Sequence, residues 1–292
     1  MESKPKNIIA LNDIVSFGRA SLANIIPIMS AMGHQVCPVP TAVLSSHTGN
    51  LGNPSVVDLT NNLPKTLSHW KSLNLNFDCI FSGYLTNKTQ GKFIKDFISE
   101  YKNAFISVDP AMADHGKLYS GVSEDIIYIM KDLISSADII FPNLTEGCML
   151  TESIYSENKS EDELKEILIK LCKMGANTAV MTSIPSKYEN TVSVMSYDSQ
   201  NNKFIRYETP MLGGAYPGTG DIFAAVCTGS LLLGKNLEES ICNSMDFISQ
   251  CIKYTLNFNE PNSYGIIFEP NLKYLFDLHN NTNFSNITLT QI

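Results

Sequence analysis

The chain has 292 residues and a formal net charge of −8 at pH 7, with 21 basic and 29 acidic side chains. This acidic balance, without a basic stripe, argues against nucleic-acid binding, while a hydrophobic fraction of 43% is normal for a globular protein. No apolar stretch is long and uncharged enough to span a membrane, and no signal peptide precedes the first apolar run. We therefore expect a protein without membrane contact.

The cysteines and histidines give no sign of a metal site or of a disulfide framework. The seven cysteines form no Cys-x-x-Cys pair and lie mostly in apolar runs, and the five histidines lack ligand spacing. Free thiols in the core are typical of a reducing compartment, so we expect a cytoplasmic protein.

Short apolar runs typical of buried strands alternate along the chain with longer runs typical of helices. Strands are predicted at 7–11, 35–39, 77–82, 104–108, 138–141 and 178–181. Helices are predicted at 61–73, 88–101, 125–136, 161–174 and 237–256, with one more ending near Met32. Two alternating segments, 191–197 and 204–208, indicate an antiparallel pair at a sheet edge.

This alternation predicts an α/β fold with a mostly parallel central sheet and helices on both faces. No linker or internal repeat divides the chain, so residues 1–292 are expected to form a single domain. The Asn- and Thr-rich tail, 280–292, is expected to be frayed.

A glycine-rich loop, Gly218-Thr219-Gly220-Asp221, leads directly into an apolar run typical of a buried helix. Glycines allow backbone N–H groups to approach an anion, and a helix N-terminus adds partial positive charge. Asp221 would lie in the first turn, where a carboxylate can accept a proton from an attacking hydroxyl group. The loop therefore indicates phosphoryl transfer to an alcohol, although the same pattern also occurs as a simple helix-capping turn.

Polar residues recur directly after the predicted strands, and in a parallel sheet these strand ends share one edge. They are Asn12, Asp13, Tyr84, Asp109, Asn143, Glu146, Thr182 and Ser183. Acidic groups near an anion site fit a Mg²⁺ ion, which takes oxygen ligands and keeps several waters. Glu146 and Asp109 are the predicted Mg²⁺ holders through water, while the spacing of Asn143 and Glu146 also matches a helix cap.

The ordered motifs resemble the ribokinase-like superfamily, and within it the pyridoxal kinase branch. The segments that carry this resemblance span roughly residues 7 to 260. They are Ser46-His47-Thr48-Gly49, Ser82-Gly83-Tyr84, Asp109 to Tyr119, Pro142 to Glu146 and Gly218 to Asp221. The resemblance implies a three-layer sandwich that phosphorylates the 5′-hydroxymethyl group of a vitamin B6 vitamer with ATP and Mg²⁺. It also implies a monovalent cation such as K⁺, a role in pyridoxal 5′-phosphate salvage and a homodimer.

The same resemblance implies a role for each matching residue. Asp221 would be the catalytic base, and Gly218, Thr219 and Gly220 would stabilise the transferring phosphoryl group through their N–H groups. The ATP site would comprise Asp109, Asp114, Tyr119, Asn143, Thr145, Glu146, Thr182 and Ser183. The vitamer would contact Asp13, Leu44, His47, Thr48 and Tyr84.

Two positions depart from the family pattern. Asp13 stands where pyridoxal kinases usually have a serine, and Ala113 replaces a usual glycine. A carboxylate at position 13 suits a protonated amine or a pyridinium nitrogen better than an aldehyde, which predicts a preference for pyridoxamine or a related aminomethyl heterocycle. A plain structural role for Asp13 at the strand end is the alternative.

Two other functions are compatible with the sequence. One is hydroxymethylpyrimidine kinase, an enzyme of the same fold that often carries cysteine where this chain has Asp221. The other is a non-catalytic protein that binds a B6 vitamer, against which the retained Asp221, Asn143 and Glu146 argue.

Overall fold

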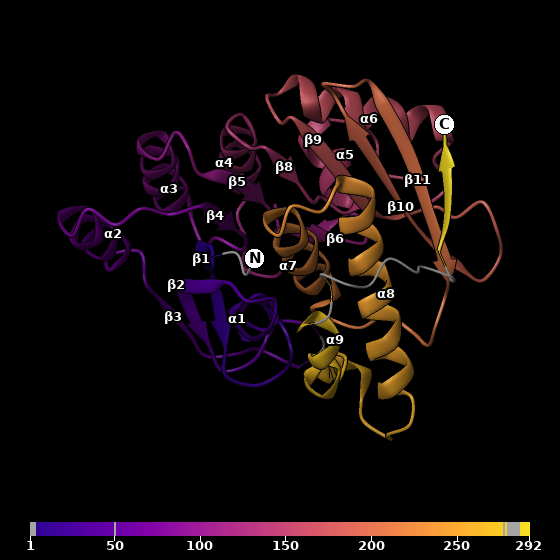
Figure 1. Cartoon of the computed structure of the whole chain (residues 1–292), viewed down its shortest axis with the longest axis horizontal. Helices are drawn as coiled ribbons and strands as arrows, with labels where there is room; N and C mark the ends of the chain where they lie inside the picture. Colours follow the sequence, from indigo (N-terminus) through magenta and orange to yellow (C-terminus); the bar gives the residue numbers. More distant parts are fainter. Residues whose placement is uncertain (1–3, 50, 277, 279–286) are drawn as a thin grey trace.

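The computed structural model describes residues 4–49, 51–276, 278 and 287–292. Within these residues, a ten-stranded sheet runs through the molecule and helices cover both of its faces (Figure 1). This is the α/β sandwich that the alternating sequence pattern predicts.

The sheet has a parallel centre and antiparallel edges. The parallel strands are β1 (Asn7–Val15), β2 (Gln35–Leu44), β4 (Cys79–Ser82), β5 (Phe105–Val108), β8 (Ile139–Ile140) and β9 (Thr178–Ile184). One edge carries β3 (Val56–Asp58), and the other carries β10 (Thr191–Asp198), β11 (Lys203–Pro210) and β12 (Thr288–Gln291). The strand order is β12-β11-β10-β9-β8-β5-β4-β1-β2-β3.

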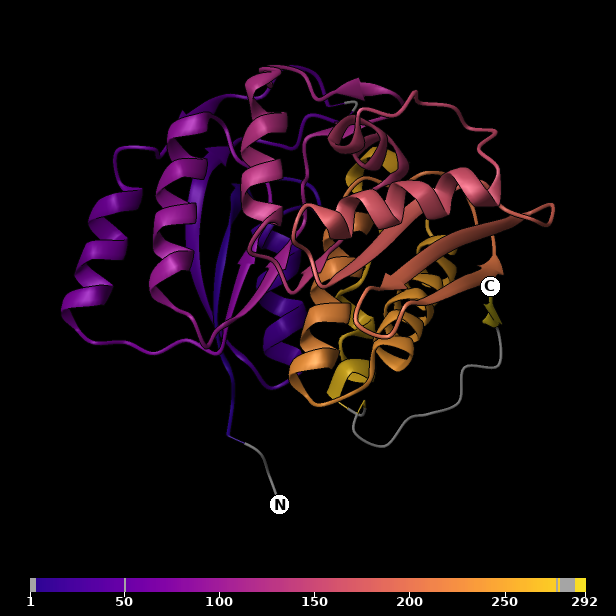
Figure 2. The same ribbon diagram turned by 90° about the horizontal axis from the view of Figure 1, so that it is seen from above.

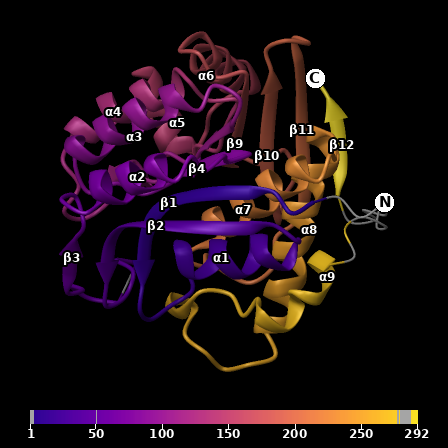
Figure 3. The same cartoon turned by 60° about the vertical axis from the view of Figure 1, so that its left-hand side comes forward.

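Each face of the sheet has its own hydrophobic core. On one face lie α2 (Leu63–Ser72), α3 (Lys88–Glu100), α4 (Asp125–Ile134), α5 (Leu144–Thr151) and α6 (Glu161–Lys173). On the other lie α1 (Leu22–Ala31), α7 (Thr219–Leu232), α8 (Leu237–Thr255) and the short α9 (Lys273–Phe276). Figure 2 shows the layers from above, and Figure 3 shows α1 and α2 on opposite sides of β1 and β2.

The first strand is longer than predicted, and this changes where its polar residues lie. Asn12 and Asp13 belong to β1 itself rather than to a segment after it. Asn12 pairs with Pro40 and Ile14 pairs with Val43, so β2 carries the extra residue of a bulge opposite Asp13. The bulge disrupts the ladder locally, and β1 continues past it to Val15.

Two further segments differ from the prediction. The polar segment between β5 and α4 contains a small ribbon of β6 (Ala113–Asp114) and β7 (Lys117–Leu118). In the tail that was expected to be frayed, 280–286 lies outside the described residues, whereas β12 pairs with β11. The 191–197 and 204–208 pair is therefore one strand in from the sheet edge.

None of the described helices is both long and apolar enough to cross a membrane. All seven cysteines are free thiols.

Candidate active site

Helix α7 begins at the predicted glycine-rich loop. Gly218 is its N-cap residue and has a φ of 79°, a backbone conformation that side chains with a Cβ rarely adopt. A Cβ at this position would also collide with the carbonyl oxygen of Arg19. The loop therefore needs glycine at 218, and it leaves the first N–H groups of α7 without acceptors inside the helix, as an anion site requires.

Asp221 is held in the first turn of α7 by two groups from other elements. The Ser21 backbone N–H donates to Oδ2 at 2.8 Å, and the Asn12 side-chain amide lies 3.4 Å from Oδ1. Removal from bulk water raises the pKa of Asp221 to about 6, although these two hydrogen bonds favour the charged form. The carboxylate is thus fixed in place and has the raised proton affinity that suits a general base.

Asp13 lies beside Asp221 in a buried position. It is 4% exposed, and its Oδ1 has no hydrogen-bond partner among the described residues. Burial raises the pKa of Asp13 to about 7, the Ser21 hydroxyl opposes this shift, and the charge of Asp221 adds to it. The carboxylate of Asp13 in turn contributes to a raised pKa of Tyr84, so Asp13 lies close to both groups.

Asn143 and Glu146 form the predicted cap of α5 and also hold the neighbouring β6–β7 segment. The Glu146 N–H donates to Oδ1 of Asn143 at 3.0 Å, and the Asn143 N–H donates to Oε2 of Glu146 at 2.9 Å. Oε1 of Glu146 accepts from the N–H groups of Met112 at 2.9 Å and Ala113 at 3.3 Å. The Asn143 amide completes the link by donating to the Ala113 carbonyl at 2.7 Å.

Three buried or partly buried carboxylates, Asp109, Glu146 and Asp221, gather at this edge of the sheet, with Asp109 close to the other two. Burial, Glu146 and Asp221 all raise the pKa of Asp109, and burial raises the pKa of Glu146 to about 7. Tyr119 lies near all three, and burial together with their charges raises the pKa of its hydroxyl. Among the ion pairs of the described residues, none neutralises this cluster.

The cluster fits a magnesium ion better than a transition metal. Its donors are carboxylate oxygens, the ligands that Mg²⁺ prefers, and uncompensated negative charge gathers where a cation would sit. Within the described ranges, no group of three or more His, Cys, Asp or Glu side chains could hold a metal ion by itself. Both the oxygen donors and the lack of a complete protein site agree with a Mg²⁺ ion that Asp109 and Glu146 would hold through water, with phosphate oxygens as further ligands.

The remaining predicted ATP-site residues lie around this cluster. Thr145 accepts the Gly116 N–H at 3.0 Å and so holds the β6–β7 ribbon, in which Asp114 is exposed. Thr182 bridges to Asn143 at the end of β9, and the exposed Ser183 follows with a φ of 54°. Thr145 lies on α5 itself, and the other three lie on elements next to it.

Three predicted vitamer-site residues are not joined to Asp13 or Asp221 by any contact found in the described part of the chain. Leu44 packs into a small core with Val15, Ala20 and Ala42, and Thr48 is exposed. His47 uses both ring nitrogens internally: Nδ1 accepts the Gly49 N–H at 3.1 Å, and Nε2 lies 2.7 Å from the Ser263 carbonyl. This arrangement gives His47 a structural role, joining its own loop to the segment around Ser263.

Three residues hold the site together; sequence reasoning placed Asn12 at this edge without a role and missed Ser21 and Asn24. Asn12 uses Oδ1 to accept the Tyr84 N–H at 2.9 Å while its amide faces Asp221. Ser21, with a φ of 58°, supplies the N–H that fixes Asp221. Asn24 donates to the carbonyls of Arg19 and Gly218. Only Asn12 carried a sequence signal, since it follows an apolar run; the other two act through tertiary contacts.

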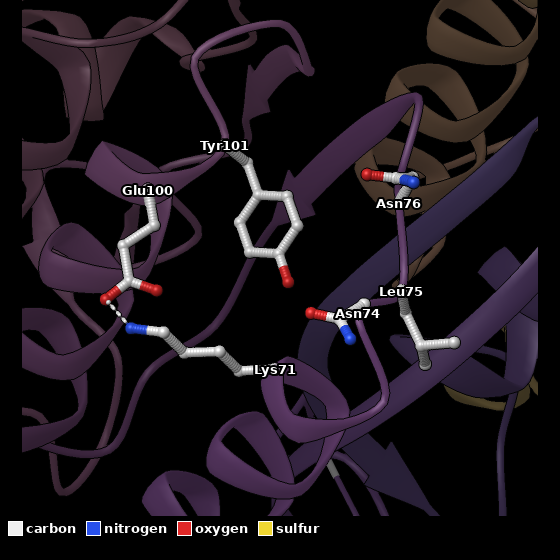
Figure 4. Close-up of a pocket in the computed structure, with 6 residues that line it drawn as sticks. All are labelled: Lys71, Asn74, Leu75, Asn76, Glu100 and Tyr101. Carbon is white, nitrogen blue, oxygen red and sulfur yellow. Dashed lines mark hydrogen bonds and ion pairs between the residues drawn. The ribbon is translucent and has the colours of Figure 1, made fainter.

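A shallow pocket lies apart from all of these residues. Lys71, Asn74, Leu75, Asn76, Glu100 and Tyr101 line it, and Figure 4 shows the Lys71–Glu100 ion pair at its rim. None of these six is a predicted site residue, and the pocket is formed by the C-terminal ends of α2 and α3. We assign it no role.

The family model for phosphomethylpyrimidine kinase matches residues 26–265, which span the second half of α1, most of the sheet and all of α7 and α8. The chain belongs to the phosphomethylpyrimidine kinase family. The match includes the glycine-rich loop and the acidic cluster of this kinase, whereas β1 with Asp13 precedes it.

Individual relatives place this kinase in the pyridoxal kinase branch of the ribokinase-like superfamily. A Bacteroides thetaiotaomicron protein assigned to the phosphomethylpyrimidine kinases and solved with pyridoxal is 37% identical, with a TM-score of 0.92 over 98% of this chain and 100% of that one. Pyridoxal kinase from Lactobacillus plantarum is 29% identical, with a TM-score of 0.86 over 94% and 98%. Pyridoxal kinase from Dictyostelium discoideum is 34% identical over 57% of this chain and 56% of its own length.

Proposed function

We propose that this kinase transfers the γ-phosphoryl group of ATP to the 5′-hydroxymethyl group of a vitamin B6 vitamer. The observation that carries the proposal is Asp221, fixed by Ser21 and Asn12 in the first turn of α7, directly beside the N–H groups of the glycine-rich loop. A base and an anion site on the same helical turn suit phosphoryl transfer to an alcohol. The vitamer follows from the relatives, one of which was solved with pyridoxal.

In this mechanism, Asp221 accepts the hydroxyl proton as the oxygen attacks phosphorus, and the N–H groups of Gly218, Thr219 and Gly220 stabilise the charge on the transferring group. Asn143, Thr145 and Glu146 position the β6–β7 ribbon over the ATP phosphates, with Asp114 and Tyr119 on it. Thr182 and Ser183 border the ATP site.

Asp109 and Glu146 would hold Mg²⁺ through water, and this ion would neutralise phosphate charge. On the vitamer side, Asp13 and Tyr84 contact the ring, while Leu44, His47 and Thr48 form its wall. A monovalent cation such as K⁺ and a cytoplasmic homodimer complete the proposal.

Initial rates of ADP formation with Mg²⁺ and K⁺ test the function directly. Pyridoxal, pyridoxamine, pyridoxine and hydroxymethylpyrimidine should be offered separately to the purified protein. We expect turnover to be fastest with a B6 vitamer. Turnover with the pyrimidine alone would instead favour the activity named by the matching family model, and vitamer binding without ADP formation would indicate a non-catalytic binding protein.

Sedimentation of the purified protein tests the assembly. A mass near twice the 32.3 kDa of one chain is the expected result, and a mass of one chain at micromolar concentration would contradict it.

A further inference from the structure

One buried carboxylate of the site has an oxygen without a hydrogen-bond partner in the described part of the chain. Asp13 is 4% exposed, yet its Oδ1 has no partner among the described residues. An unpaired buried charge is costly, and proteins normally retain one only where a proton or a cationic ligand compensates it. This carboxylate therefore needs a partner that the described part of the chain does not supply.

The neighbouring residue Asn12 links Asp13 to the site. Its Oδ1 accepts the Asp13 N–H at 2.9 Å, while its side-chain amide lies 3.4 Å from Oδ1 of Asp221. The side chain lies near the Ser21 hydroxyl, the Asp221 carboxylate and the Tyr84 ring, which come from three other segments of the chain. Of these neighbours, only Ser21 favours the charged form of Asp13, and Asp221 opposes it.

The position of Asp13 relative to Asp221 indicates which part of a vitamer it would meet. On the pyridine ring, the substituent at carbon 4 is next to the 5-hydroxymethyl group, whereas the ring nitrogen lies opposite carbon 4. Asp221 is the group that would accept the proton of the 5′-hydroxyl. The other neighbour of carbon 5, carbon 6, carries only hydrogen, so a carboxylate beside Asp221 is placed to face the carbon-4 substituent.

We propose that Asp13 selects the vitamer by binding the protonated aminomethyl group at carbon 4 of pyridoxamine, which makes this kinase prefer pyridoxamine to pyridoxal and pyridoxine. The inference rests on the proposed function. An ammonium group offers three donors, one of which satisfies Oδ1 of Asp13, and its charge also offsets the repulsion between Asp13 and Asp221. The aldehyde of pyridoxal offers no donor, and the hydroxymethyl group of pyridoxine offers one without charge.

The test compares kcat/KM for the three vitamers in the wild type, Asp13→Asn and Asp13→Ser. We expect Asp13→Asn to lower the value for pyridoxamine by about 10- to 100-fold, the size of a lost charge-assisted hydrogen bond, and to change those for pyridoxal and pyridoxine by less than about 3-fold. Asp132→Asn is the control. Asp132 is an exposed carboxylate on α4 and forms an ion pair with Lys95 of α3. An equal fall for all three vitamers would overturn the proposal, since it would assign Asp13 to the shared ring nitrogen.

A binding measurement separates this inference from the proposed function. Without nucleotide, pyridoxamine should raise the Tm of the wild type more than pyridoxine does, and Asp13→Asn should remove that difference. If the wild type turned over no vitamer, the proposed function would fail while this comparison still tested Asp13. If pyridoxamine still raised the Tm of Asp13→Asn more than pyridoxine did, Asp13 would not determine the selectivity, and the proposal would be overturned.

Discussion

At the scale of single residues, the site depends on a few carboxylates that the fold holds out of bulk water. Asp221 has hydrogen bonds from Ser21 and Asn12, whereas Oδ1 of Asp13 has none among the described residues. These two neighbouring carboxylates thus have different surroundings, which suit them to different roles. Asp221 is held in place as the base, and Asp13 has an oxygen available to bind a ligand.

Replacing the base is the sharpest test at this scale. Asp221→Asn keeps the size of the side chain and an oxygen for the Ser21 N–H, but it cannot accept the hydroxyl proton. We expect kcat to fall by about 10²- to 10⁴-fold while the KM for the vitamer changes little. Steady-state kinetics would measure both values, and a kcat within about 3-fold of the wild type would exclude Asp221 as the base.

At the scale of elements, the same capping box occurs on three described helices, α5, α6 and α8, and those of α5 and α6 have different consequences. In α5 the cap formed by Asn143 and Glu146 also binds Met112 and Ala113 of the β6–β7 segment. In α6 the cap formed by Ser160 and Glu163 is exposed and holds only its own helix and Lys159. The two glutamates therefore form a matched pair for experiment.

Glu146→Gln should disturb ATP binding, whereas Glu163→Gln should not. A glutamine at 146 would turn an N–H₂ group toward backbone donors, so we expect a loss of about 1–3 kcal/mol in the free energy of unfolding and a several-fold higher KM for ATP. Glu163→Gln should cost less than about 1 kcal/mol and leave the KM unchanged. Urea denaturation and ATP titration measure both effects, and equal changes in the two variants would contradict the positioning role of Glu146.

The two ends of α7 offer a second comparison, between Gly218 before the helix and Gly234 after it. Gly218 and Gly234 have φ values of 79° and 85°, but a Cβ at 218 would collide with the Arg19 carbonyl, whereas a Cβ at 234 would meet nothing within 4 Å. Gly234→Ala should cost about 1–2 kcal/mol of stability and leave activity intact. Gly218→Ala should cost more and lower kcat/KM for ATP, and thermal unfolding with kinetics would show whether the two variants differ in this way.

At the scale of the whole molecule, burial of acidic groups couples stability to pH. The pKa of Asp13 rises from 3.8 to about 7 on folding, so the folded state binds a proton more tightly than the unfolded state. Its contribution to stability is therefore complete below about pH 4 and is lost as the pH rises to about 7. Asp13→Asn should remove this loss.

The Tm difference between Asp13→Asn and the wild type measures this effect. We expect the difference to grow in favour of the variant as the pH rises from about 5 to about 8, in the absence of ligands. A difference that stayed constant over this range would show that Asp13 does not carry a buried charge in the folded protein.

Much of this architecture could be predicted from the sequence, because alternating apolar runs determine where strands and helices form. The parallel sheet, the cap at Asn143 and Glu146, and the position of Asp221 at the start of α7 all follow local patterns. The extension of β1 through Asp13 and the pairing of β12 with β11 depend on distant partners. The same is true of Ser21, whose backbone N–H meets Asp221 from 200 positions away. That the whole chain forms a single domain stays a prediction.

The measurement that tests the central claim most directly is identification of the product. The protein should be incubated with Mg²⁺, ATP and each B6 vitamer, and the products analysed by mass spectrometry and phosphorus NMR. We predict one phosphoryl group on the 5′ oxygen of the vitamer for each ADP formed, and far slower formation of the same product with Asp221→Asn. ADP formed without vitamer phosphate, or phosphate attached at any other oxygen, would contradict the account.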